Sequence, residues 1–169
     1  PATLAMAEAV AARCLGNPLF ACELQRWAES ERPGEPLPAS LSELVEARLS
    51  LLPVTARELL QAAAILGDDS LLEAVAQLAE HDGQDLEMTL GMLGQRGLLS
   101  IVRTPLGILV RFCHPFLREA AYAATPVEVR RDLHRRALEQ CKQARSGLFQ
   151  LAYHAALGRF IQRDPTGAW

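Results

Sequence analysis

The sequence predicts a mainly α-helical fold that contains one short β-hairpin and continues into a helical array. Leucine and alanine, at 29 and 27 residues, together make up one third of the 169-residue chain, and both are strong helix formers. Aromatic residues are only 5% of the chain, which argues against an all-β sandwich or barrel. Amphipathic segments with a helical period recur along the chain, and two short β-branched runs interrupt them after residue 97.

The first two predicted elements are helices that are separated only by Gly16 and Asn17. The alanine-rich segment 2–15 predicts a helix that ends at Gly16, because glycine tolerates the left-handed backbone of a helix C-terminus. Asn17 and Pro18 then begin a second helix, since asparagine can cap free N–H groups and proline fits the first helical turn. This helix ends near residue 30, and a linker rich in proline, glycine and glutamate follows at 31–38.

Four later positions carry the S/T-x-x-E capping box ahead of an apolar period. In this box the hydroxyl accepts from the N–H of the third residue along, while the glutamate reaches back to the cap. The pattern predicts four helix starts, at Ser40–Glu43, Thr55–Glu58, Ser70–Glu73 and Thr125–Glu128. A polar turn at 81–84 separates the third of these helices from another, which ends at Gly97.

The chain changes character at Leu98. The runs 98–102 and 108–112 are short and rich in β-branched residues, and the Pro/Gly-containing segment between them predicts a β-hairpin. His114 and Pro115 then begin a helix that continues to residue 124. Segment 54–125 therefore follows the order of a winged helix, a variant of the helix-turn-helix unit. Two further helices, at 127–145 and 148–160, would begin the array.

Several protein classes are excluded or disfavoured. No apolar run approaches the ~18 residues that cross a bilayer, so we expect no membrane contact. No signal peptide opens the chain, and a first residue of Pro rather than Met predicts a piece of a longer protein. The four cysteines, at 14, 22, 113 and 141, form no CxxC pair, which is typical of reduced thiols and predicts a cytoplasmic protein.

The common catalytic motifs are missing from the sequence. A P-loop needs G-x-x-x-x-G-K-[ST], and the only lysine, Lys142, is followed by Gln143 and has no nearby glycines. The chain cannot be a complete P-loop ATPase, and we expect no enzyme activity from it. The sequence contains no G-x-S-x-G and no H-E-x-x-H motif. The histidines, at 81, 114, 134 and 154, lack metal-ligand spacing, so we expect no metal site.

Charge gives little support for DNA binding. The helix 85–96 would be the recognition helix, yet it carries Asp85 and Glu87 near its start and only Arg96 at its end. A helix that reads the major groove presents Arg, Lys, Asn or Gln there. We therefore expect no direct DNA binding.

A basic cluster lies beyond the predicted wing. Residues 1–110 carry a net charge of −8, whereas residues 111–145 carry +4. The cluster could be a solvated helix face, a face that docks on an acidic neighbour or a bound phosphate, or a DNA contact. Its members are Arg130, Arg131, Arg135 and Arg136.

An ordered set of motifs resembles a known family. The region is similar to the part that follows the nucleotide-binding core in STAND-type signal-transduction ATPases. These AAA-related switches occur in large bacterial transcription regulators, in cyclase-linked ATPases and in some kinase-linked proteins. The match spans roughly residues 1–140. It is carried by Gly16-Asn17-Pro18-Leu19-Phe20, Leu37-Pro38-Ala39-Ser40-Leu41, Val45-Glu46-Ala47-Arg48-Leu49, Leu51-Leu52-Pro53 with Ala56-Arg57, Gln61-Ala62-Ala63-Ala64-Ile65-Leu66-Gly67, the run from Phe112 to Tyr122, and the spacing of Arg130 with His134-Arg135-Arg136.

The resemblance implies three domains. Residues 1–52 would be the helical lid, 53–125 the winged helix, and 126–169 a helical linker and the start of TPR-like repeats. The partners would be an upstream nucleotide-binding domain and a downstream helical sensor of the same chain. The cofactor would be ADP or ATP in the intact parent, with none expected in the isolated fragment.

The resemblance also implies three cofactor-binding residues. The Gly-x-Pro step of the family's lid lies against adenine, which corresponds to Gly16 and Pro18. The related NB-ARC switches place a histidine near the β-phosphate of ADP, which corresponds to His114, although Pro115 stands where that motif has Asp. Free N–H groups at a helix start favour phosphate. Pro18 could equally be a helix-initiating proline, and His114 an N-cap or a domain-packing histidine.

The leading hypothesis is a non-catalytic regulatory segment of a nucleotide-dependent switch, which closes on ADP or ATP held mainly by the upstream domain. A winged-helix DNA-binding regulator and a helical protein-interaction scaffold are the alternatives.

Overall fold

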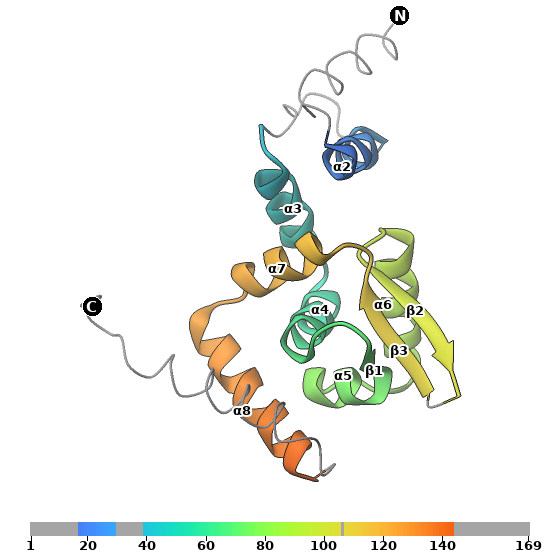
Figure 1. Ribbon diagram of the computed structural model, residues 1–169, viewed down its shortest axis with the longest axis vertical. Coiled ribbons are helices and arrows are strands. Elements are labelled where there is room, and N and C mark those ends of the chain that lie inside the picture. Colours follow the sequence, from blue (N-terminus) through green and yellow to red (C-terminus); the bar gives the residue numbers. More distant parts are fainter. Residues whose placement is uncertain (1–16, 30–38, 106, 144–169) are drawn as a thin grey trace, which may run out of the picture. The chain divides into compact units, whose positions relative to one another are not determined.

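The protein is mainly helical and carries one small antiparallel sheet, which confirms the predicted fold class (Figure 1). The computed structural model describes residues 17–29, 39–105 and 107–143. The chain divides into two compact units, 1–51 and 52–169. This division lies one residue from the boundary predicted between 1–52 and 53–125. Helix α8, the described part of 126–169, belongs to the same unit as the helices before it.

The first unit contains two described helices, α2 (Pro18–Glu29) and α3 (Leu41–Ser50). They pack through a small apolar cluster of Phe20, Leu24 and Leu44. Ser40 caps α3, because its hydroxyl accepts from the Glu43 N–H at 3.1 Å, and Glu43 in turn accepts from the Ala39 N–H at 2.9 Å. The helix start and the serine cap predicted at Ser40 are therefore confirmed, while Glu43 reaches one residue further back than the capping box predicts.

A buried carboxylate joins the two helices of this unit. Glu23 on α2 is fully buried, and its Oε2 forms an ion pair with Arg48 Nη1 on α3. Its Oε1 accepts from Arg26 Nη1 at 2.9 Å, one turn along α2. An unpaired carboxylate would be costly to bury, so the two guanidinium groups make this position possible.

The second unit is built around helix α4 (Val54–Leu66), which packs against α5, α6, α7 and α8. These neighbours are α5 (Leu72–Ala79), α6 (Gly83–Gln95), α7 (Pro115–Ala124) and α8 (Val127–Gln143). A helix surrounded on several sides needs small residues, and Ala62, Ala63 and Ala64 are all buried. The alanine run at 62–64 thus lets four helices share one core.

The sheet completes a winged helix. Its strands are β1 (Ser70–Leu71), β2 (Leu99–Thr104) and β3 (Gly107–Phe112), in the order β1-β3-β2 with antiparallel pairing. β2 and β3 form the predicted hairpin, with Leu99 opposite Phe112 and Thr104 opposite Gly107. The order α4, β1, α5, α6, β2, β3 is that of a winged helix, and α7 and α8 follow it.

Strand β1 is a correction to the sequence analysis, which placed a helix start at Ser70. Ser70 and Leu71 pair with Val110 and Leu109 of β3, and α5 begins only at Leu72. The Ser70 hydroxyl donates to the Gly67 carbonyl oxygen at 2.7 Å and caps no helix. The capping box predicted there is wrong, because pairing with β3 extends the backbone at these residues.

Two other predicted capping boxes also fail. α4 begins at Val54 after Pro53, so Thr55 lies inside the helix. The Thr125 hydroxyl is buried and donates to the Ala121 carbonyl oxygen of α7 at 2.7 Å. The two helices themselves lie where they were predicted, whereas the Thr125 hydroxyl binds a carbonyl of the preceding helix. The helices predicted at 2–15 and 148–160 lie outside the described residues.

Candidate functional site

The start of α2 presents one of the predicted site residues. Asn17 Oδ1 accepts from the N–H groups of Leu19 at 3.0 Å and Phe20 at 3.3 Å, so it caps the helix as predicted. Pro18 occupies the first helical position and is exposed. Because Phe20 anchors this turn in the core, the proline ring is held on the surface of the first unit. Gly16 lies outside the described residues.

His114 is the N-cap of α7. It is exposed, and its Nδ1 accepts from the Phe116 N–H at 3.1 Å. A ring nitrogen that accepts a hydrogen bond carries no proton, so in the neutral ring the proton lies on Nε2. The cap therefore fixes the tautomer and leaves Nε2 as a donor. Pro18 belongs to the first unit and His114 to the second.

The first turn of α7 offers fewer free N–H groups than the sequence analysis expected. Pro115 has no N–H, the Phe116 N–H donates to His114 Nδ1, and the Leu117 N–H donates to the His114 carbonyl oxygen at 3.0 Å. A phosphate at this helix end would therefore be held by His114 Nε2 and the helix dipole rather than by free backbone groups.

Most of the predicted basic cluster on α8 is engaged within the molecule. The Arg130 guanidinium lies 5.0 Å from the centre of the Tyr122 ring, a cation–π contact. Arg135 forms a hydrogen bond and ion pair with Asp132, which raise the pKa of the Arg135 guanidinium. Arg136 binds groups at the end of α5. Of the three alternatives, a simple solvated face therefore does not describe Arg130 or Arg136.

A buried histidine that sequence reasoning did not single out joins α7 to α8. His134 is fully buried, and its Nε2 lies 3.0 Å from the Tyr122 hydroxyl. The two rings meet edge to face at 5.8 Å between their centres. Its place on the apolar stripe of α8, one residue after Leu133, was the only available signal.

The surfaces through which a winged helix reads DNA carry little positive charge here. α6 contains no Lys, Arg or His, and Asp85 and Glu87 on it are exposed. On the wing, Arg111 binds Asp69 through Nε at 2.8 Å and Nη2 at 2.7 Å. Its charge is therefore partly neutralised by a carboxylate before any phosphate approaches.

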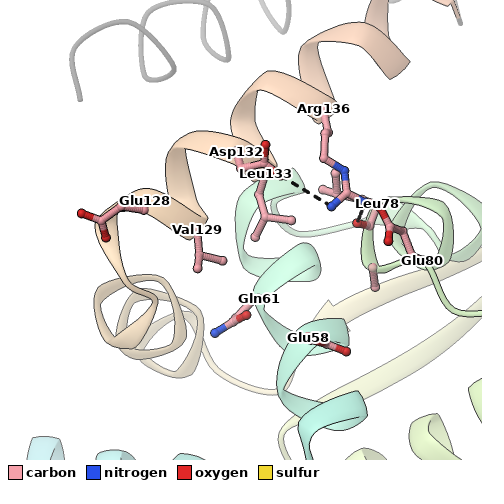
Figure 2. A pocket seen from close by; sticks show the side chains of 10 residues that line it. Glu58, Gln61, Leu78, Glu80, Glu128, Val129, Asp132, Leu133 and Arg136 are labelled. Carbon is pink, nitrogen blue, oxygen red and sulfur yellow. Dashed lines mark hydrogen bonds and ion pairs between the residues drawn. The ribbon is translucent and has the colours of Figure 1, made fainter. Parts of the chain in front are cut away.

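A groove of about 440 Å³ lies between α8 and helices α4 and α5 (Figure 2). It mixes apolar side chains with carboxylates, and Arg136 crosses one part of it. No motif in the sequence indicates this groove, because its walls come from three separate helices, α4, α5 and α8. The groove is lined by Glu58, Gln61, Leu78, Ala79, Glu80, Glu128, Val129, Asp132, Leu133 and Arg136.

Other kinds of site receive no support within the described ranges. No group of three or more histidine, cysteine, aspartate or glutamate side chains there could hold a metal ion. Cys22, Cys113 and Cys141 are free thiols. In the same ranges no helix has both the length and the apolar character needed to cross a membrane.

A scan against protein-family models gives no match for this chain, and a search of curated proteins gives none either.

Proposed function

We propose that this chain is a non-catalytic regulatory segment of a STAND-type nucleotide-dependent switch that works in the cytoplasm. The observation that carries the proposal is the contrast between two helices of the second unit. The third helix of the winged helix, α6, which would read DNA, is acidic, while α7, which follows the wing, is capped by an exposed histidine whose Nε2 can donate. Such a unit is better suited to contact a phosphate held by a neighbour than to enter a DNA groove.

In this proposal an upstream P-loop domain holds ADP, and the chain closes over it. His114 Nε2 donates to a phosphate oxygen, and the Gly16–Pro18 step packs against adenine. The Asn17 cap and the buried Phe20 keep Pro18 on the surface in the required helical conformation. Exchange of ADP for ATP would shift the population towards an open form, because only a ligand with different affinities for two forms can do so.

The proposal is tested by His114→Ala in a longer protein that carries the upstream nucleotide-binding domain. The substitution removes a hydrogen bond to a charged group, worth about 1.5–3 kcal/mol, so ADP should dissociate at least tenfold faster. Basal activity should rise, since the closed form is weakened. The rate is measured by stopped-flow displacement of a fluorescent ADP analogue.

Two controls separate the phosphate contact from the cap. His114→Asn keeps a side-chain acceptor for the Phe116 N–H and so preserves the helix start. His81→Ala removes a different histidine, whose Nε2 lies 3.1 Å from a Glu58 carboxylate oxygen, and should leave ADP release unchanged. If His114→Ala retains ADP as long as the unmodified protein does, the proposed role of His114 is wrong.

A further inference from the structure

The groove between α8 and helices α4 and α5 has an apolar floor and an acidic rim. Leu78 and Leu133 are buried at its base, and Val129 is partly exposed beside them. Four carboxylates line it, and among the described lining residues Arg136 is the only basic one. The volume of about 440 Å³ is at the small end of the range for ligand sites and suits one or two side chains. The carboxylates are those of Glu58, Glu80, Glu128 and Asp132.

Arg136 shows what one half of this groove recognises. Its Nη2 donates to the Leu78 carbonyl oxygen at 2.6 Å and lies 2.7 Å from Glu80 Oε1, while Nη1 lies 3.7 Å from Asp132 Oδ2 (Figure 2). The carbonyl belongs to the last turn of α5, where the helix dipole is negative. A planar guanidinium can bind a carbonyl and carboxylates together, which an ammonium does less well. This half of the groove is therefore an arginine site that the chain itself fills.

The other half of the groove is also lined by carboxylates, but no arginine of the lining lies between them. Glu58 projects from α4, and its described partner is His81 Nε2 at 3.1 Å. Glu128 lies in the first turn of α8, and Val129 beside it points towards α4 in Figure 2. Between them lies Gln61, an uncharged side chain that fills part of the open half. Carboxylates next to exposed apolar surface suit a cation on an aliphatic stem.

We propose that this open half docks a basic segment of a partner protein, which inserts an arginine. The aliphatic part of that arginine would lie on Val129 with its guanidinium at Glu128, while Glu58, at the other end of the open half in Figure 2, would face another basic group of the segment. Charge complementarity is the argument, because Arg136 holds Glu80 and Asp132, while Glu58 and Glu128 line a half of the groove that contains no basic lining residue. The inference concerns a different surface from Pro18 and His114 and does not depend on the switch proposal.

The test uses the whole chain and two fluorescein-labelled hexapeptides in fluorescence anisotropy. One peptide alternates arginine with leucine, and the other replaces each arginine by citrulline, its neutral isostere. We expect saturable binding of the arginine peptide with a dissociation constant below about 1 mM, and at least tenfold weaker binding of the citrulline peptide. The doubly substituted chain Glu58→Gln/Glu128→Gln should bind the arginine peptide about fivefold more weakly, as two partly exposed charge pairs suggest.

Matched variants separate the groove from overall charge. Glu87→Gln/Glu119→Gln changes the net charge equally at two exposed positions outside the groove, and should leave affinity within about twofold. Gln61→Arg supplies a guanidinium from within the chain and should abolish binding, with circular dichroism confirming the fold. The proposal is overturned if the arginine peptide does not bind, if citrulline binds equally well, or if both double variants weaken binding to the same extent.

Discussion

Gly107, at the start of strand β3, has a backbone that few other residues adopt. Its φ is +131°, and a Cβ placed there would lie 3.1 Å from Leu71 Cδ2. Only glycine adopts such a conformation without strain, and Leu71 belongs to β1, which pairs with β3. Gly107 thus allows both the tight turn of the wing and the close approach of strand β1.

Gly107→Ala should therefore destabilise the protein by about 1–3 kcal/mol, the usual cost of forcing a side chain into a glycine-only region. Urea denaturation followed by circular dichroism measures the change. Gly91→Ala is the matched control, since Gly91 is an exposed glycine inside α6 with open space around its added Cβ. That variant should stabilise α6 by about 0.5–1 kcal/mol. Equal effects at the two sites would contradict the backbone argument.

Two serine hydroxyls show the limit of prediction from sequence at the scale of single residues. Ser40 and Ser70 carry the same S-x-x-E pattern, yet Ser40 caps α3 and Ser70 belongs to a strand. The pattern indicates only that a serine could cap a helix. Whether Ser70 caps a helix or joins a strand depends on its pairing with Val110, forty residues away in sequence. His114 shows the same limit, because the Phe116 N–H confirms the N-cap that the sequence allowed, whereas the contact with phosphate stays a prediction.

At the scale of elements, α2 and α3 are joined by a pair of charges as well as by apolar packing. Glu23 is fully buried, and Arg48 retains only 12% exposure of its side chain. Glu23→Gln would leave the Arg48 guanidinium buried beside a neutral amide, which should weaken the unit by about 3 kcal/mol. Hydrogen exchange of the α2 amides, read by mass spectrometry, should speed up by roughly a hundredfold.

The double variant Glu23→Leu/Arg48→Met tests the cause of that loss. Replacing both charges by apolar groups removes the guanidinium that Glu23→Gln leaves beside a neutral amide, so exchange should return to within about 1 kcal/mol of the unmodified chain. A double variant as unstable as Glu23→Gln would show that the site needs charge for another reason. Pro18 lies on the same helix as Glu23, so a loosened α2 would also hold Pro18 less firmly in place.

Helices were the easiest elements to predict, because each one repeats its apolar period over several turns. The hairpin was predicted from its two β-branched runs and the Pro/Gly tip between them. Strand β1 has only two residues, Ser70 and Leu71, and shows no alternation from which it could be recognised. The groove was not predictable either, since its lining residues come from α4, α5 and α8 and lie together only through the packing of these helices.

At the scale of the whole molecule, charge is distributed unevenly, and several of the arginines are engaged within the molecule. The chain is net −3, with the basic excess placed after residue 110. Arg111 is bound by Asp69, Arg136 by Glu80 and the α5 terminus, and Arg130 lies over an aromatic ring. An arginine that is engaged in an internal contact is less available to a phosphate, which weakens any purely electrostatic attraction to nucleic acid.

We therefore expect the chain to give no gel shift with a 20-base-pair duplex in about 50 mM salt at protein concentrations up to roughly 10 µM, where non-specific DNA binders already associate. Asp85→Lys/Glu87→Lys places two cations on the exposed face of α6 and should produce a shift that weakens as salt rises. This variant shows whether the fold can enter a groove once the repulsion is removed. A salt-dependent shift with the unmodified chain would instead favour the DNA-binding alternative, since phosphates would then be attracted despite the carboxylates of α6.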